Sequence, residues 1–378
     1  MQKQKSLSLY IHIPFCKQKC LYCDFPSFLP ENDDISRYTK KLVEEISASA
    51  SKVQAYTIET IFFGGGTPTL LSVAQLQALM SAIFDNYIVS KNAEITIEAN
   101  PKTFDETKAK ALYDMGFNRM SIGLQAWQNE MLQTLGRIHT VEEFQKSYAI
   151  ARRVGFSNIN VDLMFALPNQ TEEIWLATLG NTIGLAPEHI SVYSLIYEEG
   201  TPFFEKLEKD ELRELDENLD RKLYHTAVEV LSQHGYVQYE ISNFAKKGKH
   251  SRHNLTYWNT TPYLGFGLLA HSYFEGKRFH NTGDFQSYLQ NDSAQKKEEV
   301  ETISQKEAMG EFLFLGLRKS EGIARAEFLE RFGEEIHSVF EEEIERCKAK
   351  RLLEESETHL YLTKLGVDLS NIVFCEFV

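Results

Sequence analysis

The feature that most restricts the fold of this chain is a regular alternation of two sequence patterns, from residue 7 to about residue 195. Short runs rich in β-branched and aromatic residues predict strands at 7–13, 58–63, 94–98, 119–123, 158–162 and 189–193. Amphipathic stretches between them predict helices at 35–49, 73–84, 104–115, 141–154 and 172–183. Strands and helices that alternate in this way form a parallel sheet with right-handed crossovers. Six units are too few to close an eight-unit barrel, so we expect an α/β fold, a partial, open (β/α)6 barrel.

Unusual residues gather where the predicted strands end. They are three cysteines after the first strand, Gly64, Gly65 and Gly66 after the second, Glu98 to Pro101 at the third, Gln125 at the fourth and Asp162 at the end of the fifth. In folds of this kind, functional residues collect just beyond the carboxyl ends of the parallel strands, which meet at one edge of the sheet. We therefore expect these residues to form a single site.

The three cysteines are Cys16, Cys20 and Cys23, in a CxxxCxxC pattern. Structural zinc sites usually combine one pair of cysteines with a distant second pair, and the sequence has no such second pair. A four-iron cluster held by three thiolates keeps one iron free for another ligand, so the pattern favours an iron–sulfur cluster over zinc. The two remaining cysteines, Cys347 and Cys375, are predicted to be small buried apolar residues.

Composition excludes several classes of protein. The formal net charge of −14 argues against a general nucleic-acid binder and against a polybasic protein of membrane surfaces. No apolar run approaches the length of about 18 residues that spans a bilayer. The first 15 residues lack the apolar segment and the cleavage site of a signal peptide, so we expect a cytoplasmic protein.

The second half of the chain has a different texture. Residues 205–222 predict a charged helix, 236–285 are aromatic and irregular, and the polar run 291–307 is the candidate linker. The remaining residues predict three helices and a β pair around 352–353 and 360–362, as in a winged-helix module. We expect a barrel with the cluster at 1–200, a region that completes it at 201–300, and a winged-helix-like domain at 301–378.

Several motifs together resemble one superfamily. The CxxxCxxC loop after a first strand, followed by a strand and a GGGTP turn, resembles the radical S-adenosylmethionine (SAM) superfamily. The segments YIHIPFCKQKCLYCDF, FFGGGTPT, EANP, LGRIHT and VDLMFALPNQT resemble, in order, the oxygen-independent coproporphyrinogen III oxidase group. The resemblance implies a [4Fe–4S] cluster on Cys16, Cys20 and Cys23, whose open iron binds SAM through its amino and carboxylate groups.

The same resemblance implies which residues hold SAM. They are Tyr10, Tyr22, Gly65, Gly66, Thr67, Glu98, Gln125, Arg137 and Asp162. Taken without the family, the glycines indicate close backbone approach to a ligand or a tight turn. Arg137 suits a bidentate bond to the carboxylate of SAM. Asp162 suits a ribose hydroxyl or a helix cap, and Glu98 could be an exposed carboxylate at a strand end.

Two departures separate the chain from the true oxidase. The oxidase has a fourth cysteine where this chain has Phe25, and it has a longer segment before its cluster. HNxxYW at 253–258, preceded by YEISNF, resembles the related heme chaperone HemW family. That family usually has glycine at the position of Ala166 and a small residue at that of Leu269, which leaves the local backbone at these two positions open.

The resemblance to HemW implies a heme chaperone that passes heme to an acceptor, a membrane-associated protein of the respiratory chain. A histidine can ligate heme iron, and Tyr and Trp offer flat apolar faces to a porphyrin. The heme-binding segment would comprise His253, Asn254, Tyr257 and Trp258, with His250 and His271 as competing ligands. The alternatives are radical oxidative decarboxylation of porphyrinogen propionates and a zinc-stabilised binding protein. Whether the chain forms a homodimer is left open.

Overall fold

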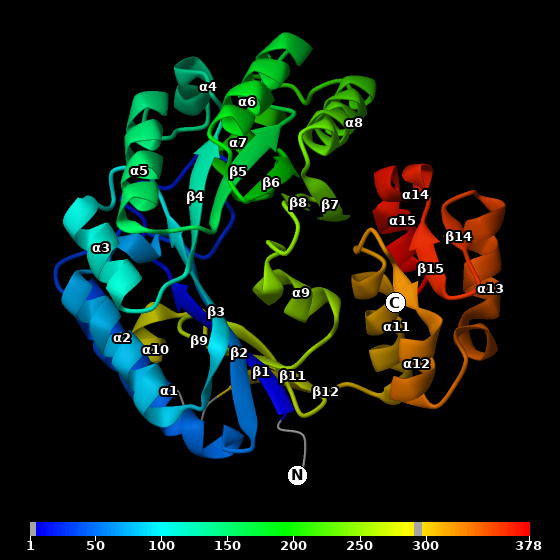
Figure 1. The fold of residues 1–378 in the computed structure, drawn as a ribbon, viewed down its shortest axis with the longest axis horizontal. Coiled ribbons are helices and arrows are strands. Elements are labelled where there is room, and N and C mark those ends of the chain that lie inside the picture. Colours follow the sequence, from blue (N-terminus) through cyan, green and yellow to red (C-terminus); the bar gives the residue numbers. More distant parts are fainter. Residues whose placement is uncertain (1–4, 291–296) are drawn as a thin grey trace.

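The centre of the fold is a run of six parallel strands, seen in a computed structural model that describes residues 5–290 and 297–378. The strands are β1 (Lys5–Ile13), β2 (Tyr56–Gly65), β3 (Val89–Ala99), β4 (Arg119–Gln125), β5 (Ile159–Phe165) and β6 (His189–Ser194). They pair in sequence order inside a twelve-stranded sheet whose order is β12-β11-β10-β9-β1-β2-β3-β4-β5-β6-β8-β7. The sheet curves without closing (Figure 1), so the predicted open (β/α)6 barrel is confirmed.

Helices cover the outer face of this curved sheet (Figure 1). They are α1 (Asp34–Ser49), α2 (Val73–Asn86), α3 (Glu106–Asp114), α4 (Asn129–Thr134), α5 (Val141–Val154) and α6 (Glu172–Gly184). Capping boxes begin α2, where Ser72 and Gln75 cap each other, and α5, where Thr140 and Glu143 do so. A cap of this kind satisfies amide groups that the first helical turn leaves without partners, which is why these helices begin where they do.

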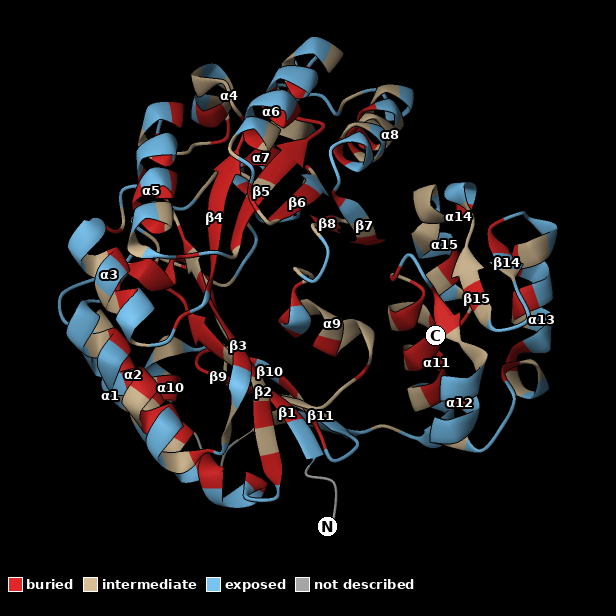
Figure 2. Cartoon of the chain, in the orientation of Figure 1, coloured by how far each residue is buried: buried red, intermediate tan, exposed pale blue. Residues whose placement is uncertain are grey.

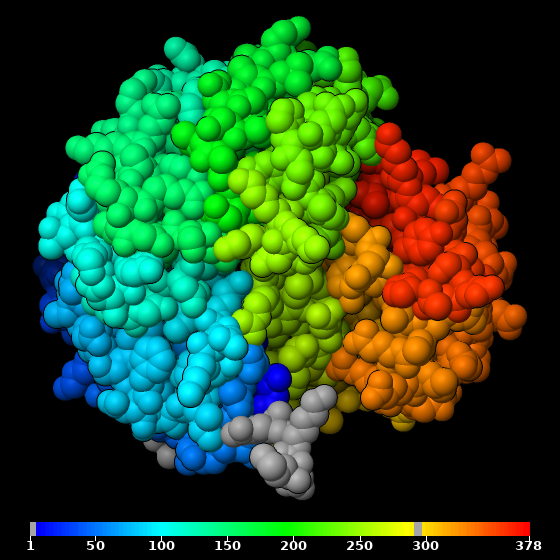
Figure 3. Space-filling view, viewed as in Figure 1, coloured from blue at the N-terminus to red at the C-terminus, as the bar shows by residue number. Residues whose placement is uncertain are grey.

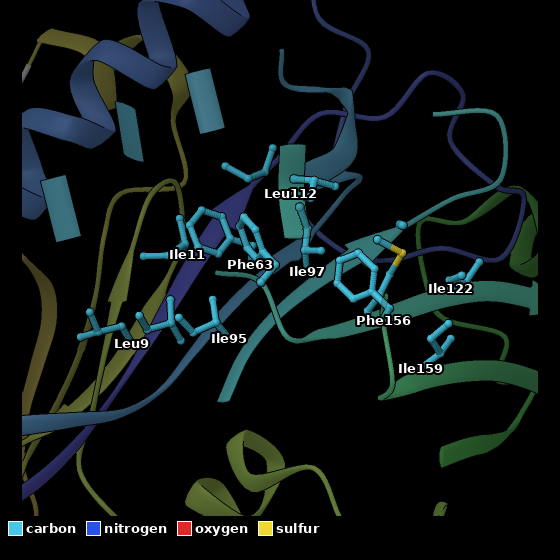
Figure 4. Packing of buried hydrophobic residues seen from close by; sticks show 14 of the residues in the cluster. Leu9, Ile11, Phe63, Ile95, Ile97, Leu112, Ile122, Phe156 and Ile159 are labelled. Atoms are coloured by element: carbon cyan, nitrogen blue, oxygen red, sulfur yellow. The ribbon is translucent and has the colours of Figure 1, made fainter. Parts of the chain in front are cut away.

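The two faces of the strands differ in chemistry because successive side chains point to opposite sides. Residues such as Leu9, Ile11, Phe63, Ile97 and Ile122 are fully buried and pack with the helices (Figure 4). The alternate positions, which face the inside of the barrel, are polar, and they include Ser8, His12, Thr60, Thr96, Ser121, Asn160 and Ser191. The strands are thus buried on both faces, but the inner face holds hydrogen-bonding groups.

Residues 201–300 extend the sheet at both edges. On one side, β9 (Tyr263–Phe266) runs parallel to β1 and is followed by β10 (His271–Phe274), β11 (Lys277–His280) and β12 (Glu298–Thr302), with α10 (Phe285–Gln290) beside α1. On the other side, β8 (Asn243–Ala245) and β7 (Val237–Glu240) follow β6. Between them, α9 (Arg252–Trp258) lies in the open middle of the barrel (Figure 1).

Three predictions for this half of the chain are wrong. Residues 236–285 are not irregular, because their short strands β7 to β11 pair onto the two edges of the barrel sheet and α9 lies between them. Residues 205–222 do not form one helix, because α7 (Pro202–Glu208) ends at Lys209 and Asp216 caps the start of α8 (Glu217–Gln233). The predicted linker 291–307 lies partly outside the described residues, at 291–296. Its remainder forms β12 and the start of α11 (Gln305–Gly316), because β12 finds a partner in β11.

The C-terminal residues form a domain with its own core, seen as a separate lobe in Figure 3. Its elements follow the order of a winged helix: α11, β13 (Ile323–Ala324), α12 (Arg325–Phe332), α13 (Ile336–Ala349), β14 (Leu353–Glu355) and β15 (His359–Leu362). Two short helices, α14 (Lys364–Asp368) and α15 (Ser370–Cys375), end the chain. Burial is densest inside this core and inside the sheet of the barrel (Figure 2).

Candidate functional site

A cavity of about 420 Å³ opens at the carboxyl edge of the six parallel strands. Its lining includes all three cysteines of the CxxxCxxC loop and eight of the nine residues predicted to hold SAM. These eight are Tyr22, Gly65, Gly66, Thr67, Glu98, Gln125, Arg137 and Asp162. Strand topology brings them together, because seven of them lie at or after the carboxyl ends of the neighbouring strands β1 to β4, whereas Asp162 lies within β5.

The loop that carries the three cysteines is held in place by backbone hydrogen bonds. The Cys16 amide donates to the Phe28 carbonyl at 2.9 Å, and the Leu21 amide donates to the Leu135 carbonyl at 3.1 Å. Gly136 has φ of +73°, and a Cβ there would lie 2.8 Å from the side chain of Leu21. The loop and the segment after β4 therefore fit only with glycine at this position.

The three thiols fit an iron–sulfur cluster as a set of donors. All three are free and half-buried, and they share one cavity. Burial raises the pKa of the Cys23 thiol to about 11, and the other two thiols add to this effect. A bound cluster would offset this penalty, since a metal ion deprotonates the thiol that coordinates it.

The remaining two cysteines lie in the C-terminal domain. Cys347 is fully buried, as predicted, but Cys375 is exposed. The prediction for Cys375 is wrong because Cys375 ends α15, the last helix, with its side chain on the surface. Neither cysteine lines the cavity.

Two side chains at the cavity wall contact cysteine sulfurs. Arg137 donates through Nη1 to Cys20 Sγ at 3.5 Å, and the hydroxyl of Thr67 lies 3.7 Å from Cys16 Sγ. The side chain of Asn100 joins them, accepting from Arg137 at 2.6 Å and donating to Thr67 at 2.8 Å. Asn100 was seen in the sequence only as part of EANP. Its role could not be predicted, because it depends on contacts with residues 33 and 37 positions away.

Two carboxyl groups lie deeper in the cavity. Glu98 accepts a hydrogen bond from the Gly65 amide at 3.2 Å, and burial, with a smaller contribution from Asp162, raises the Glu98 pKa to about 8. Asp162 accepts from Asn160 at 2.7 Å and from Ser121 at 3.1 Å, and burial raises its pKa too. Glu98 is therefore protonated at neutral pH, where it can donate a hydrogen bond as well as accept one.

The position predicted for Asp162 is wrong. It was expected to end its strand, but β5 continues to Phe165. Asp162 still reaches the cavity because it occupies an inward-facing position of β5, opposite Gly123 of β4. The later residues of β5 are apolar and continue the pairing with β6, which extends the strand beyond Asp162 to Phe165.

The backbone around the cavity is unusual at Gly65, Gly66 and Gln125. Gly65 has φ of +107°, where side chains are rarely accommodated, and a Cβ on Gly66 would lie 2.7 Å from the Phe15 carbonyl oxygen. Gln125 has φ of +74° although it is not a glycine. Such strain tends to occur at functional positions, since the surrounding structure must hold it in place.

Tyr10 is the predicted SAM residue that does not line the cavity. Its hydroxyl bonds to His12 Nδ1 at 3.0 Å, and His12 Nε2 bonds to the Pro26 carbonyl at 2.9 Å. A carbonyl only accepts, so His12 donates through Nε2, and its Nδ1 accepts a hydrogen bond from the Tyr10 hydroxyl. Tyr10 thus supports the cysteine loop indirectly, because His12 is hydrogen-bonded both to Tyr10 and to Pro26 of that loop.

The segment predicted to bind heme is helix α9, inside the barrel. His253 is 1 % exposed, and its Nδ1 bonds to Thr60 Oγ1 at 2.8 Å while its Nε2 bonds to the Tyr257 hydroxyl at 2.9 Å. The Thr60 hydroxyl donates to Ser8, so it must accept from His253 Nδ1–H. His253 is therefore the neutral tautomer with its lone pair on Nε2, and burial lowers its pKa to about 3.

The other residues of the segment and its two competitors lie in different surroundings. The ring of Trp258 packs against the guanidinium of Arg318 in the C-terminal domain, with 4.4 Å between the guanidinium carbon and the ring centroid. Asn254 is half-buried in the first turn of α9. His250 is half-buried and stacks on Tyr239, with ring centroids 4.3 Å apart. His271 is exposed on an outer strand beside His280, so the structure does not bring the three histidines together.

Both positions that depart from the HemW pattern have a left-handed backbone. Ala166 has φ of +58° and Leu269 has φ of +53°. Glycine adopts this conformation without steric cost, whereas a side chain costs about 1 kcal/mol or more. The backbone at Ala166 and at Leu269 therefore has a conformation that favours glycine, although both residues carry a side chain.

Comparison with known proteins places this cavity in a family context. The model of the Radical SAM superfamily matches residues 10–180, and that of the HemN C-terminal domain matches residues 303–369. A protein named heme chaperone HemW from Bacillus subtilis is 37% identical over 98% of this chain and 99% of its own length. A heme chaperone HemW from Lactococcus lactis is 35% identical over 99% and 98%, and one from Escherichia coli is 34% identical over 97% and 96%.

The fold also matches a solved structure. It superposes on coproporphyrinogen III oxidase (HemN) from Escherichia coli, described as a radical SAM enzyme, with a TM-score of 0.86. The match covers 99% of this chain and 90% of that one, at 22% sequence identity. At this identity the match shows a common fold, including the C-terminal domain. Among the described residues, no helix is both long and apolar enough to cross a membrane.

Proposed function

Since this chain belongs to the HemW family of radical SAM proteins, we propose that it is a heme chaperone that binds heme in the cytoplasm and passes it to an acceptor protein. The observation that carries this proposal is the similarity, over nearly the full length, to several proteins named heme chaperone HemW. The acceptor would be a heme protein of the respiratory chain at the membrane.

A [4Fe–4S] cluster on Cys16, Cys20 and Cys23 forms the second part of the proposal. Three free thiols at one cavity support it, as do the donors that face two of their sulfurs. When bound, such a cluster supplies one-electron chemistry and an open iron for SAM.

SAM would occupy the same cavity. Gly65 and Gly66 line the cavity with their backbone, since His12 and Phe15 leave no room for a Cβ on them, and Glu98, Gln125 and Asp162 offer polar groups along the wall. Arg137 is half-buried between Cys20 and the Gly123 carbonyl, where its charge can pair with a carboxylate near the cluster. Tyr22 lies near Arg137, and Tyr10 would act indirectly, through His12 and the cysteine loop.

Heme would be ligated by His253 within the HNxxYW segment. The tautomer supports this assignment, because iron takes the lone pair of Nε2 while a metal-bound histidine usually donates its other N–H to a neighbour, here Thr60. In the present conformation Tyr257 caps that lone pair and the ring is buried. Heme binding therefore requires Tyr257 and α9 to move, with Asn254, Tyr257 and Trp258 as contacts to the porphyrin.

The second candidate function is an oxygen-independent coproporphyrinogen III oxidase. The observation in its favour is the common fold with HemN, which extends over both domains. Against it stands Phe25, 62% exposed at the cavity mouth, in the place of the oxidase's fourth cysteine. The relatives from Bacillus subtilis and Lactococcus lactis, which are 35–37% identical over nearly the whole chain, carry the name heme chaperone.

An anaerobic titration with hemin, followed by the Soret band, tests the proposal. We expect saturable heme binding and no conversion of coproporphyrinogen III in the presence of SAM and a reductant. Robust decarboxylation would overturn the chaperone in favour of the oxidase, and an absence of heme binding would overturn it as well.

Single substitutions then test the iron ligand. His253→Ala is expected to remove or shift the Soret band while the cluster absorbance persists, because α9 is more than 200 positions from the cysteines in sequence and does not line the cavity. His250→Ala and His271→Ala serve as matched controls. If one of these two abolishes the heme signal and His253→Ala does not, the ligand assignment is wrong but the chaperone stands.

A further inference from the structure

We propose that Asn100 is a positioning residue that fixes Thr67 and Arg137 as hydrogen-bond donors to two of the three cluster thiolates, and thereby raises the reduction potential of the cluster. The inference rests on the proposed cluster at Cys16, Cys20 and Cys23. It concerns residues of this chain whose contacts are all present in the structure.

The orientation of the Asn100 amide follows from its neighbours. Arg137 has only donors, so the atom that meets its Nη2 at 2.6 Å must be the Asn100 oxygen. The Asn100 nitrogen then donates to Thr67 Oγ1 at 2.8 Å. Because a lone pair of Thr67 Oγ1 accepts the bond from Asn100, the hydroxyl proton of Thr67 can point at the sulfur of Cys16. The distance from Thr67 Oγ1 to Cys16 Sγ is 3.7 Å.

The same arrangement holds Arg137 against a second sulfur. Its Nη2 donates to Asn100 and to the Gly123 carbonyl, which leaves Nη1 directed at Cys20 Sγ at 3.5 Å. One amide side chain therefore connects two donors that meet two different cysteines. The third cysteine, Cys23, is not joined to this relay by any hydrogen bond among the described residues.

Little freedom remains at the three side chains. Thr67 is 3 % exposed, and the Asn100 carbonyl accepts from both the amide and the hydroxyl of Thr103, which fixes the turn after β3. A Cβ on Gly123 would lie 3.0 Å from Arg137 and 3.1 Å from Asn100. The glycine of β4 thus leaves the space that the relay occupies.

The chemical consequence concerns the charge of the cluster. A reductant adds one electron to the oxidised cluster, and no proton or bond is exchanged with the protein. The added negative charge is spread over the sulfurs, so hydrogen bonds to sulfur stabilise the reduced form and raise the potential. Removing a donor should therefore move the midpoint potential to a more negative value.

The test is a potentiometric titration of the cluster, followed by electron paramagnetic resonance without SAM, so that any effect of Arg137 on SAM is excluded. We expect Thr67→Val to shift the midpoint to a more negative value. Thr67→Ser keeps the hydroxyl and is expected to stay close to the wild type. Asn100→Leu, which frees both donors, is expected to shift the midpoint at least as far as Thr67→Val.

The double variant Thr67→Val with Asn100→Leu sharpens the test. If Asn100 acts through Thr67, the two shifts are not additive, since the second substitution removes an interaction that the first has already lost. Unchanged midpoints in Thr67→Val and Asn100→Leu, with the cluster absorbance intact, would overturn the inference. So would equal shifts in Thr67→Val and Thr67→Ser.

If a variant loses its cluster, a measurement on the wild-type protein still tests the proposed hydrogen bonds to the cysteine sulfurs. The wild-type protein exchanged into deuterated water should show deuterons coupled to the reduced cluster by electron–nuclear double resonance, and their absence would overturn the inference. A wild-type protein that takes up no cluster at all would instead overturn the cluster assignment, which is a different result.

Discussion

The cavity at the strand ends and helix α9 carry the two sets of candidate functional residues, and they differ in how they present them. In the cavity the cysteines, Gly65 and Arg137 line a space of about 420 Å³. On α9 the ring of His253 is buried and both of its nitrogens are bonded. The cavity can therefore receive a ligand in its present conformation, whereas α9 must change conformation before His253 can bind one.

The difference has a structural cause. The cavity lies at the edge where the parallel strands end, and side chains there have no further strand to pack against. Helix α9 lies across the inner faces of β1, β2 and β3. A closed series of hydrogen bonds links it to them, from His253 to Thr60, to Ser8, to Thr256 and back to the Arg252 carbonyl.

The largest effect is expected from the cysteines. Replacing Cys16, Cys20 or Cys23 with Ala should abolish the absorbance of the reconstituted cluster, because the proposed cluster depends on all three thiolates. Ultraviolet–visible spectra and iron analysis measure this. Cys375→Ala is the control and should retain the iron. Loss of iron in Cys375→Ala but not in Cys20→Ala would refute the cavity as the cluster site.

A smaller but still large effect is expected at Gly65. Gly65→Ala places a Cβ 2.5 Å from the ring of His12 in a left-handed backbone, so SAM affinity should fall by about tenfold or more without loss of iron. Isothermal titration calorimetry measures the affinity. Gly180→Ala is a matched control, since a Cβ there meets nothing within 4 Å. Equal affinities for SAM in the two variants would mean that SAM binds elsewhere.

The hydrogen bonds that hold α9 can be tested in the same way. Thr60→Val keeps the shape of the side chain but leaves the buried Nδ1–H of His253 without its partner, which should cost about 1–3 kcal/mol of unfolding free energy. Denaturant unfolding measures this. Thr57→Val, on the same strand and half-buried, is the control, with an expected change within about 0.5 kcal/mol. If the two variants unfold alike, α9 is not held by this bond.

The two regions should respond to pH in opposite directions. The Glu98 pKa is raised from 4.5 to about 8 on folding, so its contribution to stability is present below pH 4.5 and is lost as the pH rises towards 8. The His253 pKa is lowered from 6.5 to about 3, so its contribution is present above pH 6.5 and is lost as the pH falls towards 3.

Thermal unfolding between pH 5 and pH 8 separates these contributions. Glu98→Gln should abolish part of the loss of stability towards pH 8, and His253→Asn should reduce the loss towards pH 5. Parallel pH profiles for the wild type and both variants would show that neither group is perturbed in the way described.

The smallest effect is expected at Ala166. Ala166→Gly relieves a left-handed alanine, and this gain is partly offset by the greater freedom of glycine in the unfolded chain. We expect stabilisation of about 0.5–1 kcal/mol, measured by denaturant unfolding. Ala151→Gly, in helix α5, is the control and should destabilise the protein. Destabilisation by Ala166→Gly would mean that the methyl group contributes packing that outweighs the strain.

Much of the fold and of the cavity could be predicted from local patterns. All six central strands and five of the helices on the outer face were predicted, because alternating and helical periodicities are local properties of the chain. The break between α7 and α8 was not predicted, because the charged residues between the two helices continue a helical pattern. Only Asp216, which caps the start of α8, marks the break. Strand β12 was not predicted because its residues are polar; it is the edge strand of the sheet and pairs with β11.

The sequence by itself determined that a parallel sheet forms and that cysteines, glycines and polar residues collect at its carboxyl edge, because those outcomes depend on the order of strands and helices. Only the tertiary structure decided which residues meet across that edge. The contact of Asn100 with Thr67 and Arg137, and the burial of His253 against Thr60, join residues 33 to 193 positions apart. No local periodicity records such separations, so the relay at the cysteines and the closed state of α9 emerge only when the chain is folded.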